Sequence, residues 1–315
     1  MNRERVIDVK GLTKSFNGKV VVDHVDLAVR RGEIVGFLGP NGSGKTTTIR
    51  MICGLLKPDS GSGEVLGYDI LTQSDLIKLQ VGYMTQRFSF YEDLTIRENL
   101  DFVARLYDLR PRRDHVDRTL ARLGLANRQD QLAGSLSGGW KQRLALAACV
   151  MHQPRLLLLD EPTAGVDPKA RREFWDEIHE LAAEGLTVLV STHYMDEAER
   201  CHRIVYIAYG AVIARGTADE VIAGSGLHTV VVRGGDAAVI ARRLKDGDSI
   251  DQVAPFGNDL HVVGPDPVRL ERSVRDAIAG TGATAAPDAT SLEDVFIHLM
   301  SRSPDNFADG AGAGG

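Results

Sequence analysis

The chain has 315 residues, more than one domain usually holds, so we expect one large domain and one smaller domain. Apolar residues at 43% and charged residues at 25% are typical of a soluble globular protein with a substantial core. A formal net charge of -6 and a pI of 5.9 argue against a nucleic-acid-binding surface, and the three widely spaced cysteines suggest neither a disulfide framework nor a zinc site.

The N-terminal residues show an antiparallel β pattern. Residues 6–29 alternate apolar and polar in short runs, broken by Asn17-Gly18, a strong hairpin-turn signal. The first residues carry charge without an apolar leader, and no stretch approaches the ~18 apolar residues of a membrane span. If this protein serves a membrane, we therefore expect another chain to cross it.

A glycine-rich loop follows this β region, between a buried strand at residues 32–38 and a helix at residues 46–56. The loop has the spacing G-x-x-x-x-G-K-[ST] and consists of Gly39, Pro40, Asn41, Gly42, Ser43, Gly44, Lys45 and Thr46. Glycines let backbone N–H groups approach phosphate oxygens without a Cβ in the way. The N-terminus of the helix then stabilises the negative charge of the phosphate.

The side chains of this loop fit the same interpretation. Lys45 is expected to reach the β- and γ-phosphates, and the Thr46 hydroxyl is expected to bind Mg²⁺. The loop therefore predicts binding of ATP with Mg²⁺. The alternative is a glycine-rich turn that binds nothing.

Helices and short buried strands are expected in the middle of the chain. Thr95 and Glu98 have the spacing of a capping box and begin a helical stretch. Short apolar runs further on are typical of parallel strands buried on both faces. The ranges are 94–125 for the helical stretch, with a second helix at 114–123; 156–159 and 187–190 for the buried strands; 169–184 for an amphipathic helix; and 204–214 for two strands joined at Gly210.

The glycine-rich stretch at residues 224–226 is expected to end the large domain. Beyond it, apolar periodicity predicts a small β-α-β-β-α-β unit within residues 225–302. Strands are expected at 229–232, 250–254 and 260–263, and helices at 237–244 and 268–278. The Gly-, Ala- and Asp-rich tail, residues 303–315, is expected to be disordered.

Five further motifs stand in a fixed order along the chain. A Ser-Gly-Gly stretch opens a helix, a run of four leucines ends in two acids, an Ala-Gly-Val-Asp turn follows, and a glutamine and a histidine stand before and after them. These motifs are residues 136–143, 156–162 and 164–167, with Gln86 and His193. Together with the phosphate loop, they resemble the ATP-binding subunits of ABC transporters over residues 6–223.

The resemblance implies the fold class and the domains. The fold is expected to be α/β, a P-loop NTPase of the ABC ATPase type with an antiparallel β region and a helical subdomain at about residues 87–153. The ATP-binding domain would cover residues 1–224, and a small C-terminal α+β domain residues 225–302.

The resemblance also assigns residues to the nucleotide. Ser137, Gly138 and Gly139 look like the ABC signature, which caps the γ-phosphate held by the opposite subunit. On their own, the same residues fit an ordinary helix N-cap equally well. Phe16 matches the aromatic residue that stacks on adenine, and Thr47 belongs to the expected nucleotide-binding set.

Four polar residues resemble the catalytic and metal-binding groups of the family. Asp160 resembles the carboxylate that holds Mg²⁺, and Glu161 resembles the general base that polarises the attacking water. Gln86 would contact Mg²⁺ and that water, and His193 resembles the switch histidine that bonds the γ-phosphate and orients Glu161. Taken singly, such residues are more often a strand-end turn, a surface glutamine and a structural histidine.

Two stretches, residues 86–100 and 291–296, resemble the drug- and polysaccharide-exporter group, whose permease is a separate polypeptide. For the second stretch, packing of a helix face on its own domain explains the pattern equally well. The group implies two copies, or one copy and a paralogue, that close around two ATP molecules. It also implies a position in the cytoplasm on the inner face of the cell membrane, beside a multi-span permease that exports drugs, lipids or polysaccharides.

Two alternatives belong to other functional classes. A soluble ABC ATPase that remodels a macromolecular assembly would share the motifs, and the scaffold type is the hardest of these to exclude. A nucleotide-binding module without hydrolysis is disfavoured, because Asp160 and Glu161 are both present. No nucleic-acid partner is expected.

Overall fold

The structure, a computed structural model, describes residues 4–245, 247 and 249–302. The chain divides into two compact units between Ala214 and Arg215, and each unit is described by itself. The predicted tail, residues 303–315, lies outside the described residues.

An antiparallel sheet begins the first unit. It has four strands in the order β2-β1-β4-β5, with bounds β1 Arg5–Phe16, β2 Lys19–Arg30, β4 Ser60–Val65 and β5 Tyr68–Asp69. Asn17 and Gly18 connect β1 to β2 with φ angles of 51° and 79°. Two consecutive positive φ angles give a turn whose twist matches the strands, so the Asn-Gly pair forms the predicted hairpin.

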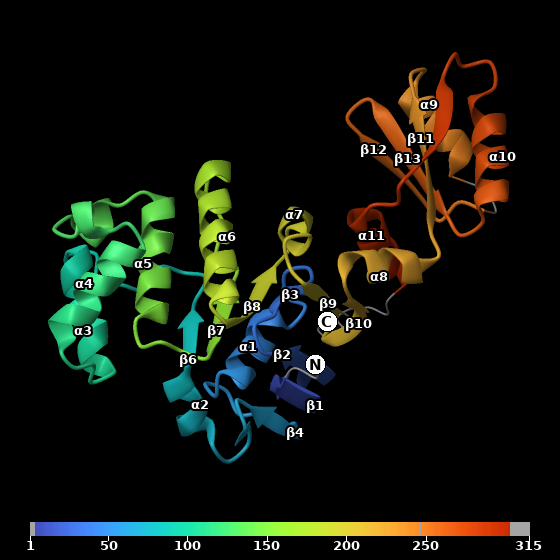
Figure 1. Ribbon diagram of the computed structural model, residues 1–315. Coiled ribbons are helices and arrows are strands. Elements are labelled where there is room, and N and C mark those ends of the chain that lie inside the picture. The colour runs from blue at the N-terminus through green and yellow to red at the C-terminus, as the bar shows by residue number, and fades with distance from the viewer. Residues whose placement is uncertain (1–3, 246, 248, 303–315) are drawn as a thin grey trace, which may run out of the picture. The chain divides into compact units, whose positions relative to one another are not determined.

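A six-stranded sheet forms the centre of the first unit (Figure 1). Its order is β10-β9-β3-β8-β7-β6, with bounds β3 Ile34–Leu38, β6 Val81–Met84, β7 Leu156–Asp160, β8 Thr187–Thr192, β9 Arg203–Ala208 and β10 Ala211–Gly216. The strands from β9 to β6 pair in parallel, and every residue of β3, β7 and β8 is buried. Full burial explains why these strands are mostly apolar, with polar residues only near their ends.

The register of the parallel strands determines where their loops begin. Leu38 pairs with Thr192, and Asp160 pairs with Ser191. The loops after β3, β7 and β8 therefore leave the sheet side by side at one edge.

Helices cover the central sheet on two sides. They are α1 Lys45–Ile52, α2 Ser74–Gln80, α3 Ile96–Leu106, α4 Arg112–Arg122, α5 Gly138–Val150, α6 Pro168–Ala183 and α7 Met195–Ala198, with short 3-10 turns at Ala126–Arg128 and Ala133–Ser135. One hydrophobic core packs the helices from α3 through α6 against the central sheet. The other packs α1, α2 and the antiparallel sheet against the central sheet. In Figure 1, α3, α4 and α5 lie together within the range expected for the helical subdomain.

The second unit is a β-α-β-β-α-β arrangement with an extra helix at each end. The elements are α8 Ala218–Ser225, β11 His228–Arg233, α9 Ala237–Leu244, β12 Gln252–Phe256, β13 Asp259–Gly264, α10 Pro267–Ile278, β14 Thr284–Asp288 and α11 Leu292–Arg302. The strand order is β12-β13-β11-β14, and all three pairings are antiparallel. This order of elements is the one that the sequence predicts.

Two boundaries differ from the expectation. Helix α1 ends at Ile52 rather than near Leu56, because Gly54 turns the chain with a φ of 75° and a Cβ there would meet the Ser74 carbonyl oxygen at 2.8 Å. The units separate at Ala214, before the expected stretch 224–226. That stretch ends helix α8, which packs on α11 of the second unit.

The capping box of α3 offers a test of local stability. Thr95 accepts a hydrogen bond from the Glu98 backbone N–H, and the Glu98 carboxylate accepts one from the Thr95 N–H. Loss of such a cap costs about 1 kcal/mol, so Thr95→Ala should lower the free energy of unfolding of the first unit by that amount. Both tryptophans, Trp140 and Trp175, lie in this unit, so their fluorescence in a urea titration reports its unfolding.

Thr217→Ala is the matched control, because Thr217 forms the same capping box with Glu220 on α8 of the second unit. Its tryptophan-monitored transition should coincide with that of the wild type. An equal shift in both variants would contradict the division into separate units.

Candidate functional site

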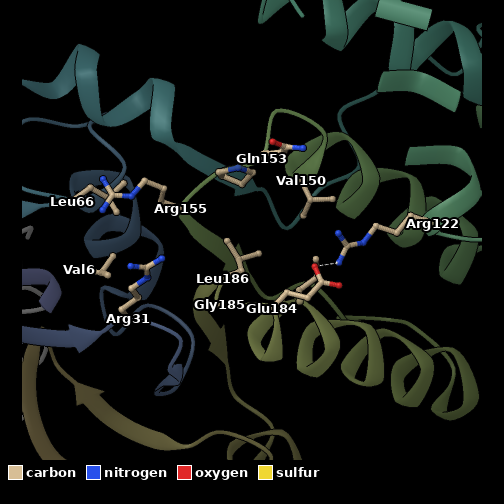
Figure 2. Close-up of a pocket in the computed structure, with 12 residues that line it drawn as sticks. Val6, Arg31, Leu66, Arg122, Val150, Gln153, Arg155, Glu184, Gly185 and Leu186 are labelled. Atoms are coloured by element: carbon tan, nitrogen blue, oxygen red, sulfur yellow. Dashed lines mark hydrogen bonds and ion pairs between the residues drawn. The ribbon is translucent and has the colours of Figure 1, made fainter. Parts of the chain in front are cut away.

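An arginine-lined cavity of about 330 Å³ opens near the amino-terminal ends of β7 and β8 (Figure 2). Arg122 on its wall is already paired with Glu184, with 2.7 Å between Nη2 and Oε2, while Arg31 and Arg155 also line it. The residues that the sequence predicts for ATP binding do not line this cavity. They gather at the opposite, carboxyl edge of the sheet.

The phosphate loop connects β3 to α1 at that carboxyl edge, and its glycines are required by close packing. A Cβ at Gly39 would stand 2.1 Å from the Ile207 carbonyl oxygen. A Cβ at Gly44 would stand 2.6 Å from the Val21 carbonyl oxygen, and Gly44 has a φ of 101° that L side chains rarely adopt. The loop can therefore take this shape only with glycine at both positions.

Lys45 lies folded inside the loop. Its side chain is 4% exposed, and Nζ donates to the carbonyl oxygens of Gly39 at 2.7 Å and Pro40 at 3.0 Å. Burial lowers the pKa of Lys45, and the nearby carboxylates of Glu161 and Asp160 partly offset that effect. Bound phosphate would add negative charge beside the amine and raise its pKa again.

A buried hydroxyl in the loop fits a phosphate ligand. Ser43 Oγ is buried and has no hydrogen-bond partner among the described residues. An unpaired buried hydroxyl costs free energy, which a phosphate oxygen would recover by accepting its hydrogen. Of the other predicted contacts, Asn41 and Gly42 are exposed on the loop, and Thr47 is half-buried on α1.

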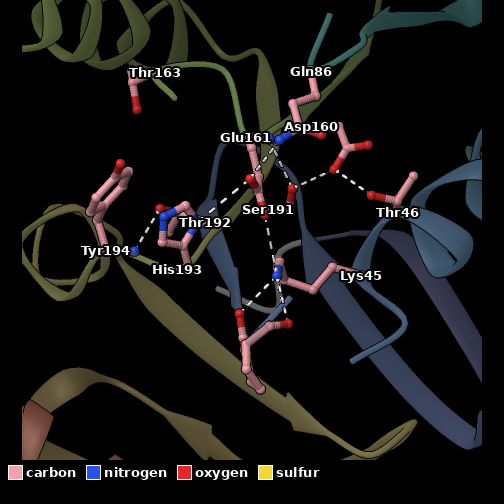
Figure 3. A network of polar contacts seen from close by, with 12 residues as sticks. Lys45, Thr46, Gln86, Asp160, Glu161, Thr163, Ser191, Thr192, His193 and Tyr194 are labelled. Atoms are coloured by element: carbon pink, nitrogen blue, oxygen red, sulfur yellow. Dashed lines mark hydrogen bonds and ion pairs between the residues drawn. The ribbon is translucent and has the colours of Figure 1, made fainter. Parts of the chain in front are cut away.

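Asp160, the last residue of β7, faces the start of α1 (Figure 3). Its Oδ1 accepts hydrogen bonds from Thr46 Oγ1 at 3.0 Å and from Ser191 Oγ at 2.7 Å. A carboxylate beside a hydroxyl is the oxygen ligand set that Mg²⁺ prefers. The predicted metal residues Thr46 and Asp160 are thus in direct contact.

Glu161 stands at the centre of the polar network. Its Oε1 lies 3.3 Å from Lys45 Nζ. Its Oε2 accepts a hydrogen bond from Gln86 Nε2 at 3.0 Å and lies 3.5 Å from His193 Nδ1. The structure therefore brings three loops that are far apart in the sequence to the loop that carries Glu161 (Figure 3).

The backbone of Glu161 is unusual and is held by Ser191. Its φ of 48° is rare for a residue with a side chain, and such conformations persist only where neighbours fix them. The Glu161 N–H donates to Ser191 Oγ at 3.0 Å, and the same hydroxyl donates to Asp160. Ser191 is not among the residues predicted from the motifs, although its position two residues before His193 is a usable signal.

The signature residues lie apart from the phosphate loop of the same chain. Ser137 is the N-cap of α5 without a side-chain cap bond, and Gly138 and Gly139 begin the helix. Ser137 and Gly139 line a cavity of about 260 Å³ together with Asp167, the N-cap of α6. A Cβ at Gly139 would stand 2.6 Å from the Ala170 Cβ, so glycine lets α5 approach α6 closely.

Phe16 ends β1 with 43% of its surface exposed. Lys14 Nζ lies 5.7 Å from the centroid of its ring, on the hairpin that leads to Asn17. An exposed ring at a strand end is free to stack on a planar group.

Within residues 4–302 as described, no helix is both long and apolar enough to cross a bilayer.

Comparison with known proteins identifies the family. The family described as ABC transporter matches residues 22–164. The daunorubicin/doxorubicin resistance ATP-binding protein DrrA of Streptomyces peucetius is 38% identical over 319 residues, which cover 96% of this chain and 94% of DrrA. The chain belongs to the ABC transporter family.

Other members of the ABC transporter family show the same relationship. The probable multidrug ABC transporter ATP-binding protein YbhF of Escherichia coli is 49% identical over 224 residues, which cover 70% of this chain and only 39% of YbhF. A solved ATP-binding subunit of an ABC transporter, 32% identical, superposes with a TM-score of 0.63 over 70% of this chain and 93% of its own. The ATP-binding cassette MJ0796, solved as a dimer with ADP and Pi, is 28% identical over 67% of this chain and 98% of its own, with a TM-score of 0.62.

These findings confirm the expected ABC transporter ATP-binding subunit, its P-loop fold, and ATP as its nucleotide. They also confirm the expected class of enzyme, an ATPase.

Replacement of Lys45 tests the phosphate loop. Hydrogen bonds from a charged donor are worth enough that Lys45→Ala should weaken ATP binding about 10- to 100-fold, as measured by calorimetric titration. Lys78→Ala is the control, because Lys78 is paired with Asp75 on the exposed side of α2. Unchanged ATP affinity in Lys45→Ala would contradict the assignment of the loop.

Proposed function

We propose that this chain binds ATP with Mg²⁺ and hydrolyses it to drive export through a separate membrane-spanning permease. The observation that carries the proposal is the Glu161 carboxylate, which Lys45, Gln86 and His193 approach from three different loops. The names of relatives support export, since DrrA is described as a drug-resistance protein and another relative as a Nod factor export protein. The proposed cargo class is accordingly drugs, lipids or polysaccharides.

Different residues are proposed to bind the nucleotide, to hold Mg²⁺ and to activate the attacking water. Lys45, Ser43 and the loop N–H groups would hold the phosphates, with Phe16 against the adenine. Thr46 and Asp160, with Gln86, would hold Mg²⁺, which supplies positive charge beside the phosphate oxygens. Glu161 would accept a proton from the water that attacks the γ-phosphorus, while the bond to the β-phosphate breaks.

Gln86 and His193 are proposed to hold the Glu161 carboxylate in position for this reaction. Both approach Glu161 Oε2, which leaves Oε1 near Lys45. A carboxylate held on both oxygens has few alternative rotamers, and a fixed base is worth more than a mobile one. His193 would in addition hydrogen-bond the γ-phosphate when nucleotide is present.

A second subunit is proposed to complete each site. Ser137, Gly138 and Gly139 present a helix N-terminus whose side-chain cap is unused, which suits an anion. The dimeric MJ0796 supports a pair of subunits with ADP and Pi. We propose a dimer, either of two copies or with a paralogue, on the cytoplasmic face of the cell membrane.

The Glu161→Gln variant tests the proposed base. The amide cannot accept the proton, so turnover should fall about 100-fold or more while ATP binding remains, and ATP-bound dimer should accumulate. Turnover and size-exclusion elution with ATP are the measurements. Glu184→Gln, which alters an acid of the distant arginine-lined cavity, should behave like the wild type. Normal hydrolysis in Glu161→Gln would rule out this base.

A detergent pull-down of the tagged protein from its native membranes tests the transport role. A stoichiometric multi-span protein should co-purify, identified by mass spectrometry, because the described residues of this chain hold no membrane-spanning helix. Recovery of soluble partners alone would instead favour an ABC ATPase that remodels a macromolecular assembly.

A further inference from the structure

A buried carboxylate lies behind the proposed site. Glu197 on α7 is 0% exposed. Each of its oxygens accepts one hydroxyl hydrogen, Oε1 from Thr163 and Oε2 from Thr192, the latter at 2.7 Å. Hydrogen bonds to an ionised buried acceptor are among the strongest in proteins, so this carboxylate holds both threonines firmly.

The two threonines belong to the loops that carry the proposed catalytic groups. Thr163 stands two residues after Glu161, in the turn that leads to the α6 N-cap. Thr192 directly precedes His193, and its hydroxyl also accepts a hydrogen bond from the Tyr194 N–H at 3.0 Å. Glu197 therefore links the loop after β7 to the loop after β8 (Figure 3 shows both threonines).

The charge of Glu197 has a counter-ion on a third element. Arg171 of α6 lies with Nε 3.6 Å from Glu197 Oε1 and with another guanidinium nitrogen 3.6 Å from Asp196 Oδ2. The guanidinium carbon also stands 4.3 Å from the centroid of the Tyr194 ring. A buried charge is tolerated only when it is paired and hydrogen-bonded, and Glu197 satisfies both conditions.

We propose that Glu197 is a positioning residue, which fixes the distance between Glu161 and His193 by holding Thr163 and Thr192 on one carboxylate. This inference rests on the proposed roles of Glu161 and His193. The contact between His193 Nδ1 and Glu161 Oε2 is 3.5 Å, longer than a good hydrogen bond, so a small shift of either loop decides whether it tightens. The bridge transmits movement of the loop after β7 to His193.

Thr163→Val and Thr192→Val test the bridge, since each removes one hydroxyl with little change in shape. Each should lower kcat for ATP hydrolysis roughly tenfold, because small misplacement of catalytic groups slows the chemical step, while KM for ATP changes less than about twofold. Serine at either position keeps the hydroxyl and should restore kcat. If a valine variant does not fold, the alanine variant at that position carries the same test.

Thr187→Val is the matched control. Thr187 is buried at the opposite end of β8, where its hydroxyl accepts a hydrogen bond from the Gly32 N–H at 3.1 Å. This variant should lose comparable stability in urea titration yet keep the wild-type kcat. A merely structural role for Thr163 and Thr192 predicts equal kcat in all three variants, and that result would overturn the proposal.

The Thr163→Val/Thr192→Val double variant separates a bridge from two independent effects. Loss of either threonine contact breaks the bridge. The kcat of the double variant should therefore be little lower than that of the less active single variant. Multiplied losses would overturn the bridge. Failure of the wild type to hydrolyse ATP would contradict the proposed function instead, whereas wild-type turnover in every variant would overturn only the role of Glu197.

Discussion

The parallel pairing of β3, β7 and β8 is the constraint on which the site depends. Leu38 pairs with Thr192 and Asp160 with Ser191, so three loops emerge at one edge of the sheet. No one of these loops carries a complete site. The phosphate loop supplies Lys45, the loop after β7 supplies Glu161, and the loop after β8 supplies His193. A shift in the register of β7 would move the acids away from the lysine.

This arrangement concentrates buried charge, and the network has to compensate for it. Lys45 is almost fully buried with Asp160 and Glu161 beside it, and burial lowers its pKa while the carboxylates oppose that change. The Lys45 amine, the Ser43 hydroxyl and the Thr46–Asp160 pair all present polar atoms to the same edge. In the proposed complex, the phosphates of a nucleoside triphosphate would place negative charge beside the Lys45 amine, and Mg²⁺ would place positive charge beside Asp160. Binding would then stabilise the folded state of this region.

The sequence predicted most of the fold because its signals are local. The Asn17-Gly18 hairpin, the Thr95–Glu98 capping box and the apolar runs of β7 and β8 each have a short-range physical cause. The boundary between units was misplaced because Gly226 ends a helix, and glycine signals the end of a helix and a linker alike. Which elements pack together is a tertiary fact that spacing does not reveal.

The candidate site shows the same limit. Its lysine, acids, glutamine and histidine could be named from motifs, and the structure places Lys45, Gln86, Asp160, Glu161 and His193 in one network. The residues that hold this network, Ser191, Thr163 and Glu197, were not predicted, because they act through contacts between loops 30 or more residues apart.

An experimental structure of the chain with ATP and Mg²⁺ would test the proposed site. We predict that Lys45 Nζ leaves the carbonyl oxygens of Gly39 and Pro40 for the β- and γ-phosphates. We also predict that the signature of a second subunit lies over the γ-phosphate. A structure in which Lys45 keeps those carbonyl bonds, with the nucleotide elsewhere, for example against Arg31 and Arg155, would contradict the proposed site.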